Sequence, residues 1–337
     1  MTETPGAVRM GPIFPGNLAG SVLRAIVAMA AAWLVASCAK IELAPHLRPL
    51  SSETMMLLGK KGMNAQSPIF VRIFKEESEL EVWKQRSDGR FYPFKTYPIC
   101  NWSGQLGPKT EYGDMQAPEG FYTITREQMN PNSHFHLALN LGYPNAFDKA
   151  HRRTGDYLMV HGKCKSAGCY AMTDALMEEI YGLARESFLG GNDSFQVQAL
   201  PFRMTDANMA RHKDHPAYAF WKTLKEGYDY FELTRQPPVV GVCNRNYVVN
   251  VALADAARMK PDRACPVLHR PKPSPFTVPP GQQLAEQHIV VPGPKMHGVT
   301  ATEPRTEMPV RSGLTKSDPA PSWWARAASH LGFAAGK

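Results

Sequence analysis

The segment Pro68–Tyr97 reads PIFVRIFKEESELEVWKQRSDGRFYPFKTY. It opens with a nearly continuous apolar run, Pro68–Phe74, which predicts a buried strand. Two further stretches, Leu80–Gln85 and Arg90–Tyr97, alternate apolar and polar side chains on either side of Ser87–Gly89. An Asp-Gly pair between two alternating stretches is a strong signal for a β-hairpin. The segment therefore predicts three consecutive strands joined by short turns.

The pattern remains β-rich up to residue 160 and becomes mixed beyond it. Thr173 and Asp174 can cap a helix whose apolar residues recur at helical spacing, and Gly190-Gly191 ends that helix. We therefore expect an α+β fold that is mainly β. The other predicted elements are strands over Gly120–Ile124, His134–Leu139, Tyr157–Val160 and Phe195–Ala199, helices from Thr205 and over Pro216–Tyr230 (with Tyr218, Trp221 and Leu224 inward), and a hairpin over Pro238–Asn250.

The N-terminus has the pattern of an export signal. Arg24 precedes the uncharged apolar run Ala25–Ser37, which is too short for a comfortable membrane span and has the length of a signal-peptide core. Val35–Cys38 matches a bacterial lipobox, in which Cys38 is lipidated. An uncleaved anchor and cleavage by ordinary signal peptidase are the alternatives. We expect an exported, membrane-associated protein in the periplasm of a Gram-negative-type envelope.

The number of cysteines bears on the chemistry of an exported chain. Outside the cytoplasm, cysteines tend to pair unless they are catalytic or buried. Once Cys38 is set aside, an odd number remains, so at least one thiol is expected to be free, as a nucleophile requires. The six cysteines are Cys38, Cys100, Cys164, Cys169, Cys243 and Cys265.

The formal net charge of +8 is concentrated near the C-terminal end. Residues after Ala256 hold 11 Lys and Arg against 5 Asp and Glu, so they carry most of the excess. The rest of the chain is nearly neutral. This disfavours a nucleic-acid-binding protein, because such proteins present a basic stripe on a folded face. A basic tail suits an anionic surface, such as a phospholipid leaflet.

The stretch HGKCKSAGCYAM, residues 161–172, contains the reactive side chains. It follows a predicted strand and precedes a predicted helix cap, a position where rigid scaffolds present reactive groups. His161 can take the proton of Cys169, whose thiolate is a strong nucleophile. Backbone N–H groups around Cys169 can stabilise an oxyanion. The group that orients His161 cannot be identified from the sequence. The residues expected to support the oxyanion and the loop are Gly168, Ser166 and Gly162.

Two alternatives use the same residues. His161, Cys164 and Cys169 could ligate zinc together with a fourth residue, although the spacing of the two cysteines is looser than in a zinc knuckle. That alternative makes the protein a non-catalytic module, stabilised by zinc or binding the cell wall. Cys164 and Cys169 could instead form a local disulfide that silences the nucleophile reversibly, as a redox switch.

The loop resembles the signature of the YkuD-type L,D-transpeptidases, and in particular that of their YafK-like murein L,D-transpeptidase branch. His161-Gly162 and Ser166–Cys169 carry the resemblance, and Tyr170–Thr173 extends it. The resemblance covers Pro68–Val249 and is far more specific than a Cys-His pair alone. Further similar stretches are Phe74–Ser78, Phe94–Cys100, Pro118–Tyr122, Met129–Ser133, Pro201–Asn208 and Gly227–Phe231.

The resemblance implies a β-rich catalytic fold with a packed helix, and a thioester mechanism. Cys169 is then the nucleophile, which attacks the carbonyl of the third residue in a peptidoglycan tetrapeptide stem, and His161 is the base. Terminal D-alanine leaves, and an amine of another stem resolves the thioester to give a 3–3 cross-link. No cofactor and no metal is expected.

The loop also departs from the wider family. Ala167 stands where most members have a histidine, and Tyr170–Met172 takes the place of a common arginine. These departures leave the acceptor open. An amine makes the protein a transpeptidase, whereas water makes it a hydrolase that cleaves peptides or an outer-membrane lipoprotein from the wall. Arg203 could hold a substrate carboxylate in place of the missing arginine or form a surface salt bridge, and Tyr170 could contact the substrate.

These observations divide the chain into five parts. Residues 1–38 form a signal peptide with a lipobox, or a membrane anchor, and residues 39–66 form a spacer. Residues 67–200 form the L,D-transpeptidase catalytic domain, and residues 201–254 form its helical and hairpin extension. Residues 255–337 form a basic, Pro-rich tail, which we expect to be disordered because it has too few apolar residues to offset the entropy of ordering.

Overall fold

The computed structural model describes residues 43–295. Residues 1–42 and 296–337 lie outside the described part, so the predicted export signal over residues 1–38 and the last part of the predicted tail are not described. None of the helices within the described residues combines the length and the apolar character that crossing a bilayer requires.

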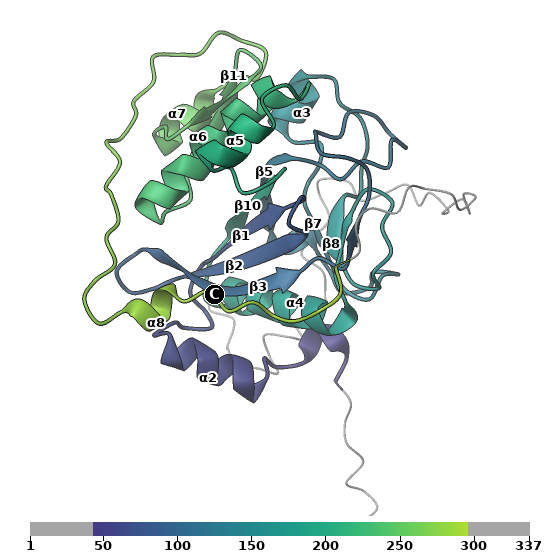
Figure 1. Ribbon diagram of the computed structural model, residues 1–337, viewed down its shortest axis with the longest axis vertical. Coiled ribbons are helices and arrows are strands. Elements are labelled where there is room, and N and C mark those ends of the chain that lie inside the picture. Colours follow the sequence, from purple (N-terminus) through teal and green to yellow (C-terminus); the bar gives the residue numbers. More distant parts are fainter. Residues whose placement is uncertain (1–42, 296–337) are drawn as a thin grey trace, which may run out of the picture. The chain divides into compact units, whose positions relative to one another are not determined.

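A five-stranded mixed sheet forms the centre of the fold, in the order β3-β2-β1-β10-β5 (Figure 1). β1 (Ile69–Phe74), β2 (Glu79–Gln85) and β3 (Phe91–Pro98) form an antiparallel meander. β1 also pairs in parallel with β10 (Ser194–Leu200), which pairs antiparallel with β5 (Gly120–Thr125). The three consecutive strands predicted from the start of this region are confirmed.

A second five-stranded sheet, in the order β4-β9-β8-β7-β6, contains residues near both ends of the stretch 161–172, which holds the predicted nucleophile and is called the active-site loop. β8 and β9 are parallel neighbours, and the other neighbouring pairs are antiparallel. The strand predicted from His134 begins only at Ala138. The strands are β4 (Asn101–Trp102), β6 (Met129–Asn130), β7 (Ala138–Asn140), β8 (Met159–His161) and β9 (Tyr170–Ala171).

Helix α4 (Asp174–Leu189) begins and ends where the sequence predicts. The Thr173 hydroxyl accepts the Leu176 N–H, which satisfies an amide of the first turn. Gly190 follows the last helical residue. The buried face of α4, including Met177 and Ile180, belongs to the main hydrophobic core. The helix therefore starts directly after the active-site loop and is held firmly in place.

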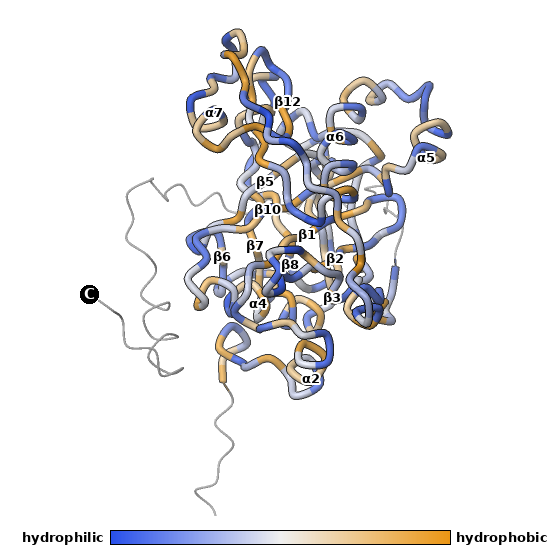
Figure 2. Tube along the Cα trace, turned by 90° about the vertical axis from the view of Figure 1, so that its left-hand side faces the viewer, coloured by the Kyte–Doolittle hydropathy of each residue, from blue (hydrophilic) through white to orange (hydrophobic). Residues whose placement is uncertain are grey.

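Helix α6 (Tyr218–Thr234) packs on the other side of the central sheet (Figures 1 and 2). It buries Trp221 and Leu224, as predicted, whereas Tyr218 is only half-buried. Phe70 of β1 lies against Phe231 of α6, with 4.5 Å between the ring centroids.

The two faces of β1 enter different cores, and this explains its nearly continuous apolar run, which only Arg72 interrupts. Side chains alternate along a strand. Val71 and Ile73 belong to the core that contains α4, whereas Phe70 and Phe74 belong to clusters formed with α6. A strand that is covered on both faces does not need polar positions, so the run differs from the alternating pattern of a half-buried strand.

The ordered part of the chain begins earlier than predicted. The spacer assigned to residues 39–66 is wrong from Ala44 onward, because α2 (Ser52–Lys60) buries Leu58 in the main core. Arg185 of α4 also donates to the carbonyl oxygens of His46 and Arg48, at 2.8 Å each. These contacts fix the segment to the catalytic region.

The predicted tail likewise starts too early. A disulfide joins Cys265 to Cys243, and Ala285 is buried in the main core. Val290 forms a bridge to Thr96 of the edge strand β3. The segment 255–295 is therefore anchored to the domain at these residues, although most of its other residues are exposed, and residues 296–337 lie outside the described part.

The remaining elements fit the sequence in part. The hairpin predicted over residues 238–250 and the helix predicted from Thr205 are confirmed. Their bounds, with those of the other short elements, are η1 (Pro45–Leu47), η2 (Arg126–Gln128), α3 (Ala146–Ala150), α5 (Asp206–Arg211), α7 (Leu253–Arg258), α8 (Gln283–Glu286), β11 (Val240–Cys243) and β12 (Asn246–Val249).

Candidate active site

The loop between β8 and β9 joins the two predicted catalytic residues, since His161 is the last residue of β8 and Cys169 directly precedes β9. Because the two strands are parallel neighbours, the loop must turn back on itself to return Ala171 beside His161. Gly168 lies at a φ of 115°, a conformation that favours glycine, immediately before Cys169. This turn places Cys169 against the residues that lead into β8.

Cys169 is the free cysteine of the described part of the chain. Its side chain is half-buried, and its thiol donates to the Tyr157 carbonyl oxygen over 3.6 Å. Burial raises the pKa of the thiol to about 11, and the Lys109 ammonium offsets part of that rise. The thiol is therefore protonated at neutral pH and needs a base before it can attack.

His161 is buried and held in one orientation by a backbone carbonyl. Its Nδ1 lies 2.7 Å from the Gly162 carbonyl oxygen. A carbonyl can only accept, so Nδ1 carries the proton and Nε2 is left as the acceptor. Burial lowers the pKa of His161, which keeps the ring neutral at neutral pH. The Gly162 carbonyl is thus the orienting group that the sequence does not reveal.

Gly162 has no room for a side chain. A Cβ at this position would lie 2.5 Å from Asp174 Oδ1 and 3.1 Å from the Phe135 carbonyl oxygen. The same Asp174 oxygen accepts the Lys163 N–H at 2.8 Å. A larger residue would therefore displace the carbonyl that orients His161.

Two serine hydroxyls engage the backbone amides beside the thiol. The Gly168 N–H donates to Ser103 Oγ at 2.6 Å, and the Cys169 N–H donates to Ser166 Oγ at 3.1 Å. The Ser166 hydroxyl donates to the Cys169 carbonyl oxygen at 2.7 Å and so closes the turn. Both amides predicted to stabilise an oxyanion are therefore already hydrogen-bonded. Sequence reasoning missed Ser103, which follows β4 and lies outside the motif.

A disulfide between Cys100 and Cys164 ties the active-site loop to the end of β3. The Cys164 N–H donates to the Met172 carbonyl oxygen at 3.1 Å. Lys163 and Cys164 both have positive φ, at 64° and 50°, which is uncommon for residues other than glycine. The loop therefore keeps a strained conformation that its surroundings must stabilise.

This disulfide overturns both alternatives for the loop cysteines. The local disulfide predicted between Cys164 and Cys169 is wrong, because Cys164 pairs with Cys100. The zinc site fails for the same reason, since the sulfur of Cys164 is not available as a thiolate. Within residues 43–295, no group of three or more His, Cys, Asp or Glu side chains is arranged to hold a metal ion. The expected free thiol is present, at Cys169.

Two residues predicted to contact substrate belong to the framework instead. Tyr170 is fully buried, and its hydroxyl donates to the Pro118 carbonyl oxygen at 2.6 Å. Arg203 donates to Glu79 and Glu81 at 2.6 Å each, so the salt-bridge alternative is the one observed. Neither side chain is available to hold a substrate carboxylate, and both predictions are wrong.

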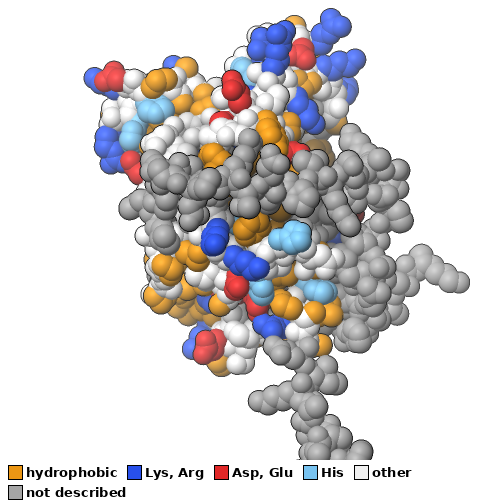
Figure 3. All heavy atoms as spheres, turned by 90° about the vertical axis from the view of Figure 1, so that its right-hand side faces the viewer, with side chains coloured by type: hydrophobic (Ala, Val, Ile, Leu, Met, Phe, Trp, Pro, Cys, Tyr) orange, Lys and Arg blue, Asp and Glu red, His pale blue; other side chains and the backbone are white. Residues whose placement is uncertain are grey.

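Charged side chains lie next to the loop on the surface. His136 Nε2 lies 2.8 Å from Glu178, and Arg48 donates to the same carboxylate at 2.9 Å. Figure 3 shows histidine, acidic and basic side chains beside apolar ones on the described part of the face seen from the right-hand side of Figure 1. The surface beside the loop is thus polar and mixed in charge.

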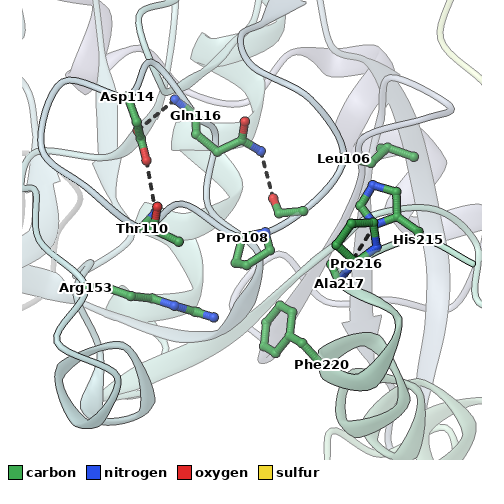
Figure 4. Close-up of a pocket in the computed structure, with 11 residues that line it drawn as sticks. Leu106, Pro108, Thr110, Asp114, Gln116, Arg153, His215, Pro216, Ala217 and Phe220 are labelled. Atoms are coloured by element: carbon green, nitrogen blue, oxygen red, sulfur yellow. Dashed lines mark hydrogen bonds between the residues drawn. The ribbon is translucent and has the colours of Figure 1, made fainter.

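A cavity of about 530 Å³ opens beside residues 106–116 (Figure 4). Neither Cys169 nor His161 lines it. Its walls come from the loop after β4, from the segment before β8 and from the start of α6. The lining residues are Leu106, Gly107, Pro108, Thr110, Asp114, Gln116, Arg153, His215, Pro216, Ala217 and Phe220.

Alkylation of Cys169 is expected to report the protonated thiol. Because burial holds its pKa near 11, the rate constant with iodoacetamide should rise about tenfold per pH unit between pH 7 and 9.5. The rate is measured by mass spectrometry of the Cys169 peptide, with both disulfides left intact. A plateau below pH 8 would instead indicate a preformed thiolate and contradict this prediction.

Comparisons with known proteins agree with the resemblance of the loop. Residues 70–197 match the family model of the YkuD L,D-transpeptidase catalytic domain. The chain is 44% identical over 228 residues to "Putative L,D-transpeptidase YafK" of Escherichia coli (strain K12), which covers 68% of this chain and 92% of that protein.

Two solved structures are also similar over part of the chain. The helical cell shape determining protein Pgp2 of Campylobacter jejuni is 15% identical, with a TM-score of 0.33, over 58% of this chain and 80% of that one. Bd1075 of Bdellovibrio bacteriovorus is 21% identical, with a TM-score of 0.28, over 49% and 61%. The family match and the identity to YafK, taken with the α+β fold, show that the chain belongs to the YkuD L,D-transpeptidase family.

Proposed function

We propose that this protein is an exported cysteine acyl-enzyme that acts on peptidoglycan stem peptides as an L,D-transpeptidase. Family membership supports the class of reaction. The observation that carries the assignment of residues is the free, half-buried thiol of Cys169 directly before β9, the strand that pairs with β8, whose last residue is His161 with its Nε2 left to accept a proton.

Acylation begins when the Cys169 thiol gives its proton to His161 Nε2. Sγ then bonds to the carbonyl carbon of the third stem residue, and the bond from that carbon to the nitrogen of terminal D-alanine breaks. The amine leaves with the proton returned by His161. A neutral thiol and a neutral imidazole suit this order, because burial raises the pKa of the first and lowers that of the second.

The tetrahedral intermediate requires N–H donors for its oxyanion, and one such donor is typically worth about 10²–10³ in rate. The amides of Gly168 and Cys169 are the nearest donors to the thiol along the backbone. Ser103 and Ser166 accept from them in the free enzyme. The serine hydroxyls therefore hold the turn in shape until the substrate oxygen replaces them.

The second half of the reaction depends on what attacks the thioester. An amine of another stem forms a new amide and regenerates the thiol, giving a 3–3 cross-link. Water gives a carboxylate instead, and the same Cys-His pair then acts as a hydrolase on stems or on a wall-linked outer-membrane lipoprotein. The acylation step is common to both outcomes.

Two disulfides support an extracytoplasmic location. Cys100–Cys164 and Cys243–Cys265 are both formed, and such bonds persist in oxidising compartments such as the periplasm. This agrees with the export pattern before residue 39. Attachment to the membrane, by an anchor or by a lipid on Cys38, belongs to the same proposal.

Purified protein incubated with disaccharide-tetrapeptides tests the proposal. We expect free D-alanine together with 3–3 cross-linked dimers, identified by mass spectrometry. Tripeptide monomers alone would identify a hydrolase, and a lipoprotein-linked stem added as substrate would show whether that link is cleaved. Absence of both D-alanine release and a thioester adduct on Cys169 would overturn the proposed function.

A further inference from the structure

The cavity beside residues 106–116 (Figure 4) contains a nearly buried arginine without a full set of partners. The Arg153 side chain is only 9% exposed, and its Nη1 donates to Asp148 at 2.8 Å. Its guanidinium lies over the rings of Phe147 and Phe220, at 5.0 and 4.9 Å from their centroids. Nε and Nη2 have no hydrogen-bond partner within residues 43–295.

Asp148 fixes the arginine and does not compete for a ligand in the cavity. It is completely buried, and its oxygens also accept from the backbone N–H of Asn145 and from the Tyr122 hydroxyl. Its acceptor positions therefore face inward. The guanidinium packs against the stacked rings of Phe147 and Phe220, and its remaining N–H groups are left for an acceptor that enters the cavity.

A second N–H donor comes from the opposite wall. His215 Nδ1 accepts the Ala217 N–H at 3.1 Å, so in the neutral ring the proton lies on Nε2. The ring is stacked on Trp221 at 4.3 Å, which prevents it from turning. Nε2 has no partner among the residues that the structure describes. Figure 4 shows Arg153 and His215 on two sides of the same space.

The acidic side chain that lines the cavity already has hydrogen-bond and ion-pair partners. Asp114 lines it, but its carboxylate pairs with Lys109 and accepts the N–H groups of Thr110 and Glu111. The cavity therefore offers N–H donors from Arg153 and His215 and apolar surface from Phe220. This combination suits a carboxylate carried by an amphipathic chain.

Two segments connect the cavity walls to the thiol. The Tyr157 carbonyl oxygen accepts from the Cys169 thiol. Arg153 lies four residues before Tyr157, so the Cα atoms of Arg153 and Tyr157 are at most about 14 Å apart. The Gln116 carbonyl oxygen lies 3.5 Å from the place of a Cβ at Gly168. A peptide of three to four residues has a comparable length when extended, about 10–14 Å.

We propose that this cavity is a subsite for a carboxylate of the donor peptide, bound by Arg153 and His215 while the peptide acylates Cys169. The inference rests on the proposed function and adds the recognition of the donor to it. It also replaces Arg203, which the sequence suggested for this role and which is bound to Glu79 and Glu81.

A comparison of two donor peptides tests the subsite. The first is a tetrapeptide stem with its free carboxylates, and the second has the carboxylates upstream of the scissile bond amidated. The main variant combines Arg153→Gln with Asp148→Asn, so that no buried carboxylate is left unpaired. His215→Phe keeps a ring on Trp221 and removes the Nε2 donor, together with the acceptor of the Ala217 N–H. Arg152→Gln, at an exposed neighbouring position, is the matched control.

D-alanine release without an added acceptor isolates the acylation step. For the free-carboxylate stem, we expect the Arg153 variant to lose about 10- to 100-fold in kcat/KM, mainly through KM, because a hydrogen bond to a charged group is lost. For the amidated stem, the variant and the unaltered enzyme should agree within about threefold. Equal losses on both stems, or no loss on either, would overturn the subsite.

Binding provides a readout that does not depend on catalysis. In a Cys169→Ala background, calorimetry should show the free-carboxylate stem binding at least tenfold more weakly after either substitution in the cavity. If this holds while the unaltered enzyme releases no D-alanine, the subsite stands and the proposed chemistry fails. If D-alanine is released normally and binding is unchanged by both substitutions, the proposed function stands and the subsite is wrong.

Discussion

Replacement of Cys169 by alanine is expected to reduce D-alanine release from peptide stems by about 10⁴-fold or more. Alanine removes the sulfur that forms the thioester and leaves no free thiol in the loop, because Cys164 is bound to Cys100. The effect should appear in kcat, since the residue takes part in bond formation. It is measured by coupled detection of D-alanine, with thermal unfolding as a check of the fold.

A control in the same loop separates chemistry from loop damage. Lys165 is exposed and lies between Cys164 and Ser166, so Lys165→Ala should change the rate by less than about threefold. Cys169→Ser retains a nucleophilic atom with a much higher pKa and should remain at least about 10²-fold slower than the unaltered enzyme. If Cys169→Ala retains more than one percent of the activity, Cys169 is not the nucleophile.

Local sequence patterns predict much of this fold. The Asp-Gly turn and its flanking alternation define β2 and β3, because both signals come from residues next to each other in the chain. Thr173 and Thr205 define the starts of α4 and α5, since a hydroxyl satisfies amides of the first helical turn. The motif predicts that His161 follows a strand, and β8 ends at His161.

Features that depend on distant residues are not contained in such patterns. The pairing of Cys100 with Cys164 bridges 64 residues, and only the fold determines which sulfurs meet. The segment after Ala44 has a weak apolar pattern, yet Leu58 is buried because α4 and the sheet supply its surroundings. Arg203 has the chemistry of a carboxylate ligand, but Glu79 and Glu81 of β2 already provide the carboxylates.

Backbone groups are a second reason for the limits of prediction. The Gly162 carbonyl sets the tautomer of His161. Every residue has a backbone carbonyl, so the sequence does not indicate which carbonyl accepts from a given side chain. Ser103 likewise reaches Gly168 from a different strand connection. Both groups act through the conformation of the active-site loop, so the integrity of that conformation should matter as much as the motif itself.

Loss of the Cys100–Cys164 disulfide is therefore expected to lower the acylation rate by about a hundredfold in an enzyme that is still folded. Lys163 and Cys164 keep positive φ values beside His161, and the disulfide is one of the restraints that hold them there. A displacement of about 1 Å in a catalytic group can cost about 10²-fold in rate. The double variant Cys100→Ser/Cys164→Ser is assayed for D-alanine release at 20 °C.

The second disulfide provides a matched control for stability. From the lengths of the closed loops, 64 and 22 residues, Cys100–Cys164 should contribute about 4 kcal/mol and Cys243–Cys265 about 3 kcal/mol to the free energy of unfolding. The variant Cys243→Ser/Cys265→Ser should thus be destabilised to a similar extent. Its acylation rate should stay within about threefold of normal, because β11 and the segment after β12 are not part of the active-site loop.

Similar rates in the two double variants would show that the first disulfide only stabilises the fold. A selective loss in the first would show that it positions His161 and Cys169, so that the motif is reactive only while its loop is clamped to the end of β3.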